Sequence, residues 1–92
     1  MSVTVLIPKH LGRHVGNKSQ ISVEASDLKA TLETLSRDYH LEDVLLTRDG
    51  HLQGFIRLII DDQFVTATSA EDLRRVAVAG KRVEIQSAFA GG

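Results

Sequence analysis

Apolar residues alternate with polar ones in several short segments of the chain, which is the pattern of half-buried β-strands. The first segment spans residues 3–7, and Pro8 ends it because proline has no backbone N–H to donate. The alternation resumes at Ile21 and Val23, after a connection that contains two glycines. These two segments are predicted to form a hairpin with a long connection.

The second half of the chain repeats this strand pattern. Residues 56–60 alternate around Ile56, Leu58 and Ile60, and residues 82–87 around Val83 and Ile85. Between them, Asp61-Asp62 indicates a turn, 63–65 a short edge strand, and 69–75 a short helix.

One segment has the period of an α-helix instead. Its apolar residues are separated by four, three and four positions, which places them on one helical face. They are Leu28, Leu32, Leu35 and Tyr39. Ser26 and Asp27 precede them and offer oxygens that can cap the first turn. The stretch 41–54 that follows is mixed, with a turn at Asp49-Gly50.

The order strand, strand, helix, strand, short strand, strand predicts an α+β protein of the β-grasp (ubiquitin-like) class. In this fold a mixed sheet of four to five strands packs on one main helix. We expect one β-grasp domain over residues 1–87 and a flexible Gly-Gly tail over residues 88–92. Terminal glycines add nothing to a core, so either the tail is idle or its carboxylate is the working part.

Strand alternation also predicts a second surface. If the apolar positions of the strands face the helix, then Leu6, Arg57, Ile59 and Glu84 face the opposite way. We expect Leu6 and Ile59 to flank Glu84 and to form a patch that continues toward Phe89 at the base of the tail. Leu6, Arg57, Ile59 and Phe89 are therefore the candidate residues for docking a partner.

Composition excludes several other functions. The chain has 42% hydrophobic and 25% charged residues, which fits one domain. Because 11 Lys and Arg against 12 Asp and Glu are interspersed and give a net charge of −1, we expect neither a nucleic-acid nor a membrane partner. No cysteine is present for a disulfide or a nucleophile, and no leader or membrane segment is evident, so a cytoplasmic location is expected.

No residue pattern indicates catalysis by this chain. The four histidines, His10, His14, His40 and His51, lack the spacing of metal ligands and are interpreted as solvated loop residues. Neither a nucleophile with its base nor a cofactor motif is evident. We therefore expect no metal, no bound cofactor and no enzymatic activity of its own.

Three segments carry a resemblance to a known family. They are VTVLIPKHLGRHVGN, DGHLQGFIRLIIDDQFV and GKRVEIQSAFAGG. Together they resemble the ThiS/MoaD group of ubiquitin-like sulfur-carrier proteins, and the length is closest to the cysteine-biosynthesis (CysO) branch. Relatives often have an acidic pair before the last strand and a proline after it, where this chain has Lys81-Arg82 and Ser87.

The resemblance implies a chemical role for the tail. Gly92 would be adenylated by an ATP-dependent activating enzyme and converted to a thiocarboxylate, with Ala90 and Gly91 as the threaded approach. The implied partners are this adenylating enzyme, which uses ATP and a sulfur source, a sulfur-accepting synthase and, if Gly92 must first be exposed, a metalloprotease. The free protein would be a monomer, and the metabolite that receives the sulfur stays open.

Two other functions use the same tail. The chain could be the small subunit of a molybdopterin-synthase-like complex, with its tail in the active site of a larger subunit. It could also be a ubiquitin-like modifier that is conjugated to lysine through Gly92. The sequence discriminates weakly among these three, although its length and long loops favour the carrier.

Overall fold

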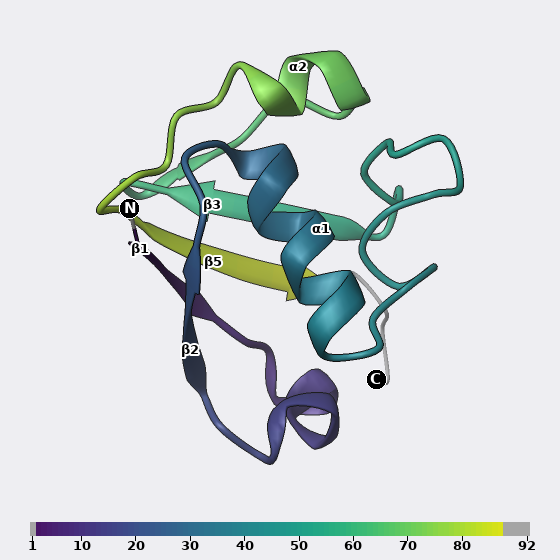
Figure 1. Ribbon diagram of the computed structural model, residues 1–92, viewed down its shortest axis with the longest axis vertical. Helices are drawn as coiled ribbons and strands as arrows, with labels where there is room; N and C mark the ends of the chain where they lie inside the picture. The colour runs from purple at the N-terminus through teal and green to yellow at the C-terminus, as the bar shows by residue number, and fades with distance from the viewer. Residues whose placement is uncertain (1, 88–92) are drawn as a thin grey trace.

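The computed structural model describes residues 2–87, and the predicted tail at 88–92 lies outside this range. The strands are β1 (Ser2–Leu6), β2 (Gln20–Glu24), β3 (Ile56–Ile60), β4 (Gln63–Phe64) and β5 (Arg82–Ser87). The helices are the 3₁₀ helix η1 (Lys9–Val15) and the α-helices α1 (Leu28–Asp38) and α2 (Ala70–Arg74) (Figure 1). Neither α-helix in the described part is long and apolar enough to cross a membrane.

The five strands form one mixed sheet in the order β2-β1-β5-β3-β4. The first strand, β1, pairs antiparallel with β2 and parallel with β5, and β3 pairs antiparallel with both β4 and β5. The last strand is thus the central one. This order, with one main helix on one face, confirms the predicted β-grasp class.

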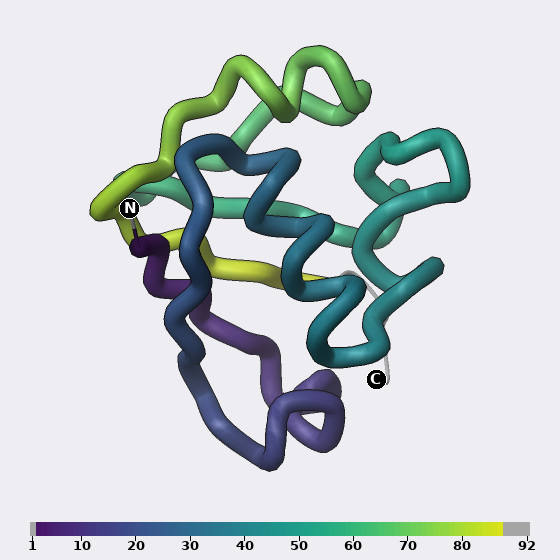
Figure 2. The backbone as a smooth tube through the Cα atoms, in the orientation of Figure 1, coloured from purple at the N-terminus to yellow at the C-terminus, as the bar shows by residue number. Residues whose placement is uncertain are grey.

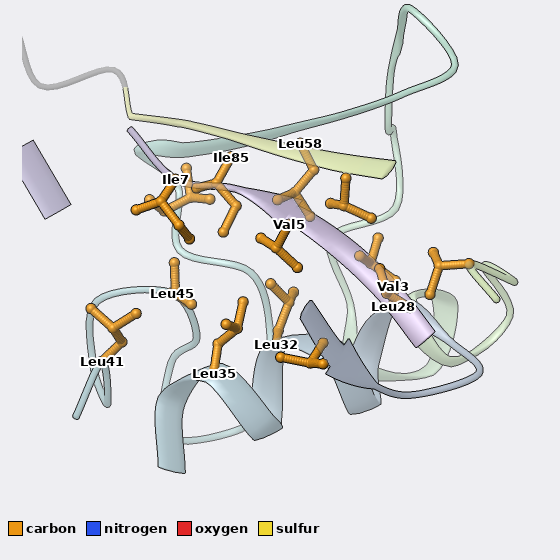
Figure 3. Packing of buried hydrophobic residues seen from close by; sticks show 14 of the residues in the cluster. Val3, Val5, Ile7, Leu28, Leu32, Leu35, Leu41, Leu45, Leu58 and Ile85 are labelled. Carbon is orange, nitrogen blue, oxygen red and sulfur yellow. The ribbon is translucent and has the colours of Figure 1, made fainter. Parts of the chain in front are cut away.

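The core lies between the sheet and α1, as strand alternation predicts. Figure 3 shows side chains of both layers meeting in this space. The buried strand residues are Val3, Val5, Ile21, Val23, Ile56, Leu58, Ile60, Val83 and Ile85. From α1, Leu28, Leu32 and Leu35 are fully buried, whereas Tyr39 is half-buried and follows the helix as its C-cap.

The N-terminal ends of both α-helices are capped by side-chain oxygens. Asp27 is the N-cap of α1, and its carboxylate accepts a hydrogen bond from the Ala30 N–H at 2.8 Å. Ser69 caps α2 in the same way by accepting from the Asp72 N–H at 3.1 Å. Each cap satisfies a backbone donor that the first helical turn leaves without a partner.

The connection between β1 and β2 is more ordered than the sequence predicted. Its η1 helix buries Leu11 and Val15, so this segment extends the core beyond the sheet. Gly16 ends the helix in the left-handed conformation, and the Ile7 N–H closes the connection by donating to the Ser19 carbonyl at 2.8 Å. The two glycines of this connection predict a loop, but the structure shows that Gly16 is the C-cap of η1.

The segment between α1 and β3 forms a compact loop beside the helix (Figure 2). It buries four leucines, which are Leu41, Leu45, Leu46 and Leu52. A turn at its tip is closed by the Gly50 N–H, which donates to the Thr47 carbonyl at 3.0 Å. Lys29 of α1 is only 5% exposed, and a Cβ on Gly50 would lie 3.0 Å from its Cε atom.

We expect Gly50→Ala to destabilise the fold for two reasons. Gly50 has a φ of +81°, which costs an alanine about 1 to 2 kcal/mol, and the new methyl group would also displace the Lys29 side chain. The free energy of unfolding from urea titration measures the loss.

Two matched variants separate these contributions. Gly80→Ala tests the backbone alone, because Gly80 has a φ of +74° and nothing within 4 Å of the added Cβ. Gly54→Ala has neither a left-handed φ nor a neighbour within 4 Å and is the neutral control. Equal losses for Gly50→Ala and Gly80→Ala would show that Lys29 moves away at no cost.

Candidate functional site

The candidate site begins where the central strand ends. Ser87 is the last residue of β5 and also the last that the structure describes. It is opposite Ile56 of β3, while Glu84 is opposite Leu6 of β1 on the other side. The described chain therefore ends at the C-terminal end of the central strand, where Ser87 is paired with β3.

The candidate tail residues lie outside the described part of the chain. They are Phe89, Ala90, Gly91 and Gly92. Their roles in docking, threading and covalent chemistry stay predictions. The structure does fix the strand to which they are attached.

The sheet face opposite α1 carries a continuous row of four side chains, which we call the outer row. The backbone register places Leu6 opposite Glu84, Glu84 opposite Ile59, and Ile59 opposite Phe64. The outer row therefore crosses β1, β5, β3 and β4. Leu6 and Ile59 flank Glu84 on this face, as strand alternation predicts, and all three side chains are half-buried.

Phe64 is the member of this row that the sequence analysis missed. Phe64 is 59% exposed. Among the described residues, no other large hydrophobic residue is exposed to solvent. The signal was present in the Asp61-Asp62 turn, where both residues have positive φ, 54° and 65°. Two such residues form a tight two-residue hairpin, which fixes the register and places Phe64 beside Ile59.

Arg57 is close to the exposed end of the row. Its guanidinium carbon lies 5.8 Å from the centroid of the Phe64 ring, within the range of a cation–π contact. This contact keeps the aromatic ring of Phe64 next to a positive charge on the same face. Arg57, a candidate docking residue, therefore lies beside the outer row.

Two shallow depressions, each of about 480 Å³, adjoin Leu6 and Glu84. One extends from them toward Ile59 and the Lys81–Asp61 ion pair, whose charged atoms are 3.3 Å apart. The other is lined by His10, Gln86 and Ser87 as well. The Gln86 amide donates a hydrogen bond of 2.8 Å to the Glu84 carboxylate.

The histidines do not come together as a metal site. Within residues 2–87, no group of three or more histidine, aspartate or glutamate side chains is arranged to hold a metal ion. His51 has a structural contact instead, because its Nδ1 atom accepts a hydrogen bond of 3.0 Å from the Ala70 N–H. This hydrogen bond connects the loop before β3 to the start of α2. The interpretation of His51 as a solvated loop residue did not predict it.

Three solved structures share this fold over nearly the whole chain. A chain of the Amycolatopsis orientalis BexX/CysO complex superposes with a TM-score of 0.77 at 23% identity, covering 98% of this chain and 99% of that one. Mycobacterium tuberculosis CysO gives 0.77 at 27% identity, covering 95% and 99%. Haloferax volcanii SAMP1 gives 0.76 at 18% identity, covering 100% of both chains.

The fold is therefore that of the ubiquitin-like sulfur-carrier and modifier proteins, a group of small carriers and modifiers. The similarity to CysO and SAMP1 structures agrees with the resemblance found in the sequence. No protein-family model matches the chain, and no curated protein is significantly similar to it. At these identities the structures define the fold, and the particular role has to be argued from the site.

We expect the outer row to hold the partner protein that receives the tail. Ile59→Asp should weaken binding to the activating enzyme by about 1 to 3 kcal/mol, as expected for a moderate interface anchor. Phe89→Asp should have a similar effect if the patch extends to the base of the tail. Isothermal titration calorimetry measures both losses.

Ser22→Asp is the matched control for this experiment. Ser22 is exposed on the same sheet face in β2 but lies outside the outer row, so it adds the same charge at a different place. Thermal melting checks that all variants fold. Wild-type affinity for both Ile59→Asp and Phe89→Asp would place the docking surface elsewhere.

Proposed function

We propose that this protein is a sulfur carrier whose C-terminal Gly92 is the attachment point for sulfur. A partner enzyme would adenylate the Gly92 carboxylate, and the resulting thiocarboxylate would donate sulfur in the biosynthesis of cysteine or another sulfur-containing metabolite. The chain would act as a cosubstrate of its partners. One observation carries this proposal: β5 is the central strand of a β-grasp sheet, and after three further residues the sequence has Gly91-Gly92.

The chemistry needs two steps because a carboxylate is a poor acyl donor. In the first, a carboxylate oxygen of Gly92 attacks the α-phosphate of ATP, which forms an acyl-adenylate and releases pyrophosphate. In the second, a sulfide equivalent attacks the carbonyl carbon and AMP leaves, so that one oxygen is replaced by sulfur. Division into two steps lowers each barrier, and glycine leaves the carbonyl unhindered.

The body of the domain would supply recognition and the partners would supply catalysis. The outer row, whose apolar members are Leu6, Ile59 and Phe64, would offer a partner a surface to grip while the tail enters its active site. Holding the body in this way raises the effective concentration of the reacting carboxylate. A CysO protein of Amycolatopsis orientalis was crystallised in complex with BexX, and we propose a comparable complex with a partner protein here.

A modifier role is the second candidate, and a specific observation favours it. SAMP1, named small archaeal modifier protein 1, superposes over the whole chain. In that role the activated Gly92 carbonyl would form an isopeptide bond with a lysine amine. The small-subunit role in a molybdopterin-synthase-like complex uses the same activated end, with a large partner subunit as the acceptor.

We expect Gly92 to be the covalent site. Incubation with an activating enzyme, ATP and sulfide should raise the mass of the protein by the difference between one sulfur and one oxygen, and fragment mass spectrometry should localise this change to Gly92. Deletion of Gly92 should abolish the mass change with no loss of stability, because the described core lies entirely within residues 3–85.

Two outcomes would contradict this expectation. Unchanged product from the Gly92-deleted chain would end the carrier hypothesis. Recovery of Gly92 in isopeptide linkage to lysines of other proteins, with no thiocarboxylate, would favour the modifier.

We also expect the isolated chain to show no turnover. Nothing in the sequence indicates a nucleophile, metal site or cofactor site, so catalytic power has to come from a partner. Assays of the purified protein with ATP and sulfide, but without an activating enzyme, should release no pyrophosphate. Release that persists after repurification, and disappears with Gly92 deletion, would contradict this.

A further inference from the structure

The even charge balance of the whole chain hides an uneven distribution. Residues 1–23 contain three of the 11 lysines and arginines and none of the 12 acidic residues. With neutral histidines this part carries a formal charge of +3, whereas the remaining eight basic and twelve acidic residues give −4. The prediction that the charges are interspersed is therefore wrong for the first quarter of the chain.

All of these basic residues lie on η1 and the turn that follows it. We call them the basic cap, which consists of Lys9, His10, Arg13, His14 and Lys18. Their side chains are exposed, except that of His14, which is half-buried. Within residues 2–87, no ion pair includes a member of the basic cap. Its positive charge is thus not neutralised within the described part of the protein.

The basic cap is held in place by the core. Leu11, Gly12 and Val15 are buried on the inner side of η1, while Lys9 and Arg13 of the same helix are exposed. The Asn17 N–H donates to the Gly12 carbonyl at 2.7 Å, which closes the end of the helix. A partner would therefore meet a preorganised charged surface, which lowers the entropy lost on binding.

The basic cap also lies at the end of the sheet where β5 ends. Because β1 and β5 are parallel, the segment after β1 and the segment after β5 start from the same end of the sheet. His10 and Ser87 accordingly line one depression, together with Leu6 of the outer row. Figure 1 shows η1 at the opposite end of the molecule from α2.

We propose that the basic cap docks an acidic surface of the partner protein that receives the C-terminal tail. This inference rests on the proposed function, because it assumes that a partner approaches this end. Three fixed charges without an aromatic side chain among them are a small footprint for a nucleic acid. The net charge of −4 on the rest of the chain would further oppose a polyanion, whereas a local acidic patch would meet only the basic cap.

The first experiment uses the full chain and an oligoglutamate peptide as the acidic probe. NMR titration should shift the amide resonances of residues 9–19 and 84–87. The combined variant Lys9→Gln, Arg13→Gln and Lys18→Gln should lose this response. The control variant Arg48→Gln, Arg74→Gln and Arg75→Gln removes the same charge from exposed positions elsewhere and should keep it.

Three results of this titration would overturn the proposal. The first is the absence of a shift at residues 9–19. The second is a response of the combined Lys9, Arg13 and Lys18 variant that equals the wild-type response. The third is the appearance of the same shifts at lower concentration with a single-stranded oligonucleotide. The last result would make the basic cap a nucleic-acid site. The Gly92-deleted chain should respond as wild type does, so this test does not depend on the chemistry of the tail.

The second experiment measures association with the activating enzyme by stopped flow. At low salt the Lys9, Arg13 and Lys18 variant should associate roughly fivefold to tenfold more slowly than wild type and lose most of its salt dependence, because surface charges act mainly on the association rate. If this variant forms the thiocarboxylate and also associates at the wild-type rate, the docking role of the basic cap is overturned and the proposed function is not. A retained NMR response with no thiocarboxylate would instead count against the proposed function.

Discussion

The parallel pairing of β1 with β5 is the contact on which the rest of the structure depends. It joins the first and last strands of the chain, and backbone bonds such as the Thr4 N–H to the Lys81 carbonyl at 3.1 Å support it. A second bond runs from the Gly80 N–H to the Ser2 carbonyl at 2.8 Å. Because this pairing closes nearly the whole chain into one loop, its entropic cost has to be met by burial of the core. That burial follows at once, since Val5 and Val83 are paired in register and both are fully buried.

The same pairing explains why the functional features gather at one end and on one face. A parallel neighbour brings the end of β5 next to the end of β1, so Ser87 and η1 share one end of the sheet. An antiparallel arrangement of these two strands would have separated them by the length of the sheet. Register then aligns Leu6, Glu84 and Ile59 across three strands, with Phe64 added by the Asp61-Asp62 hairpin.

Much of this could be predicted from the sequence because the elements obey simple periods. The inner faces of β1, β3 and β5, the apolar face of α1 and the Asp27 cap follow from alternation, from spacing and from side-chain chemistry. The outward direction of Leu6 and Ile59 followed from the same alternation. For the same reason, the sequence alone predicts the β-grasp order of the strands and the main helix.

The features that the sequence did not predict depend on contacts between different segments of the chain. The spacing of apolar residues within one segment does not indicate such contacts. Leu11 and Val15 anchor η1 to a core that only the folded sheet creates. Lys29 reads as a solvent-facing helix residue, yet it is buried because the Gly50 turn packs over it. His51 gains its role only when α2 presents the Ala70 N–H. The position of Phe64 required the hairpin register, which depends on backbone angles at two aspartates.

The outer row and the basic cap differ in what each can contribute to an encounter with a partner. Apolar contacts such as those of Ile59 act over short distances and mainly lengthen the life of a complex once it has formed. Charges such as those of Lys9 and Arg13 act over about a Debye length, roughly 8 Å at physiological salt, and mainly raise the frequency of productive encounters. The carrier role that we propose would benefit from fast association combined with moderate affinity, because each partner would have to release the protein. A modest apolar row next to an unpaired basic surface matches that requirement better than a large apolar interface would.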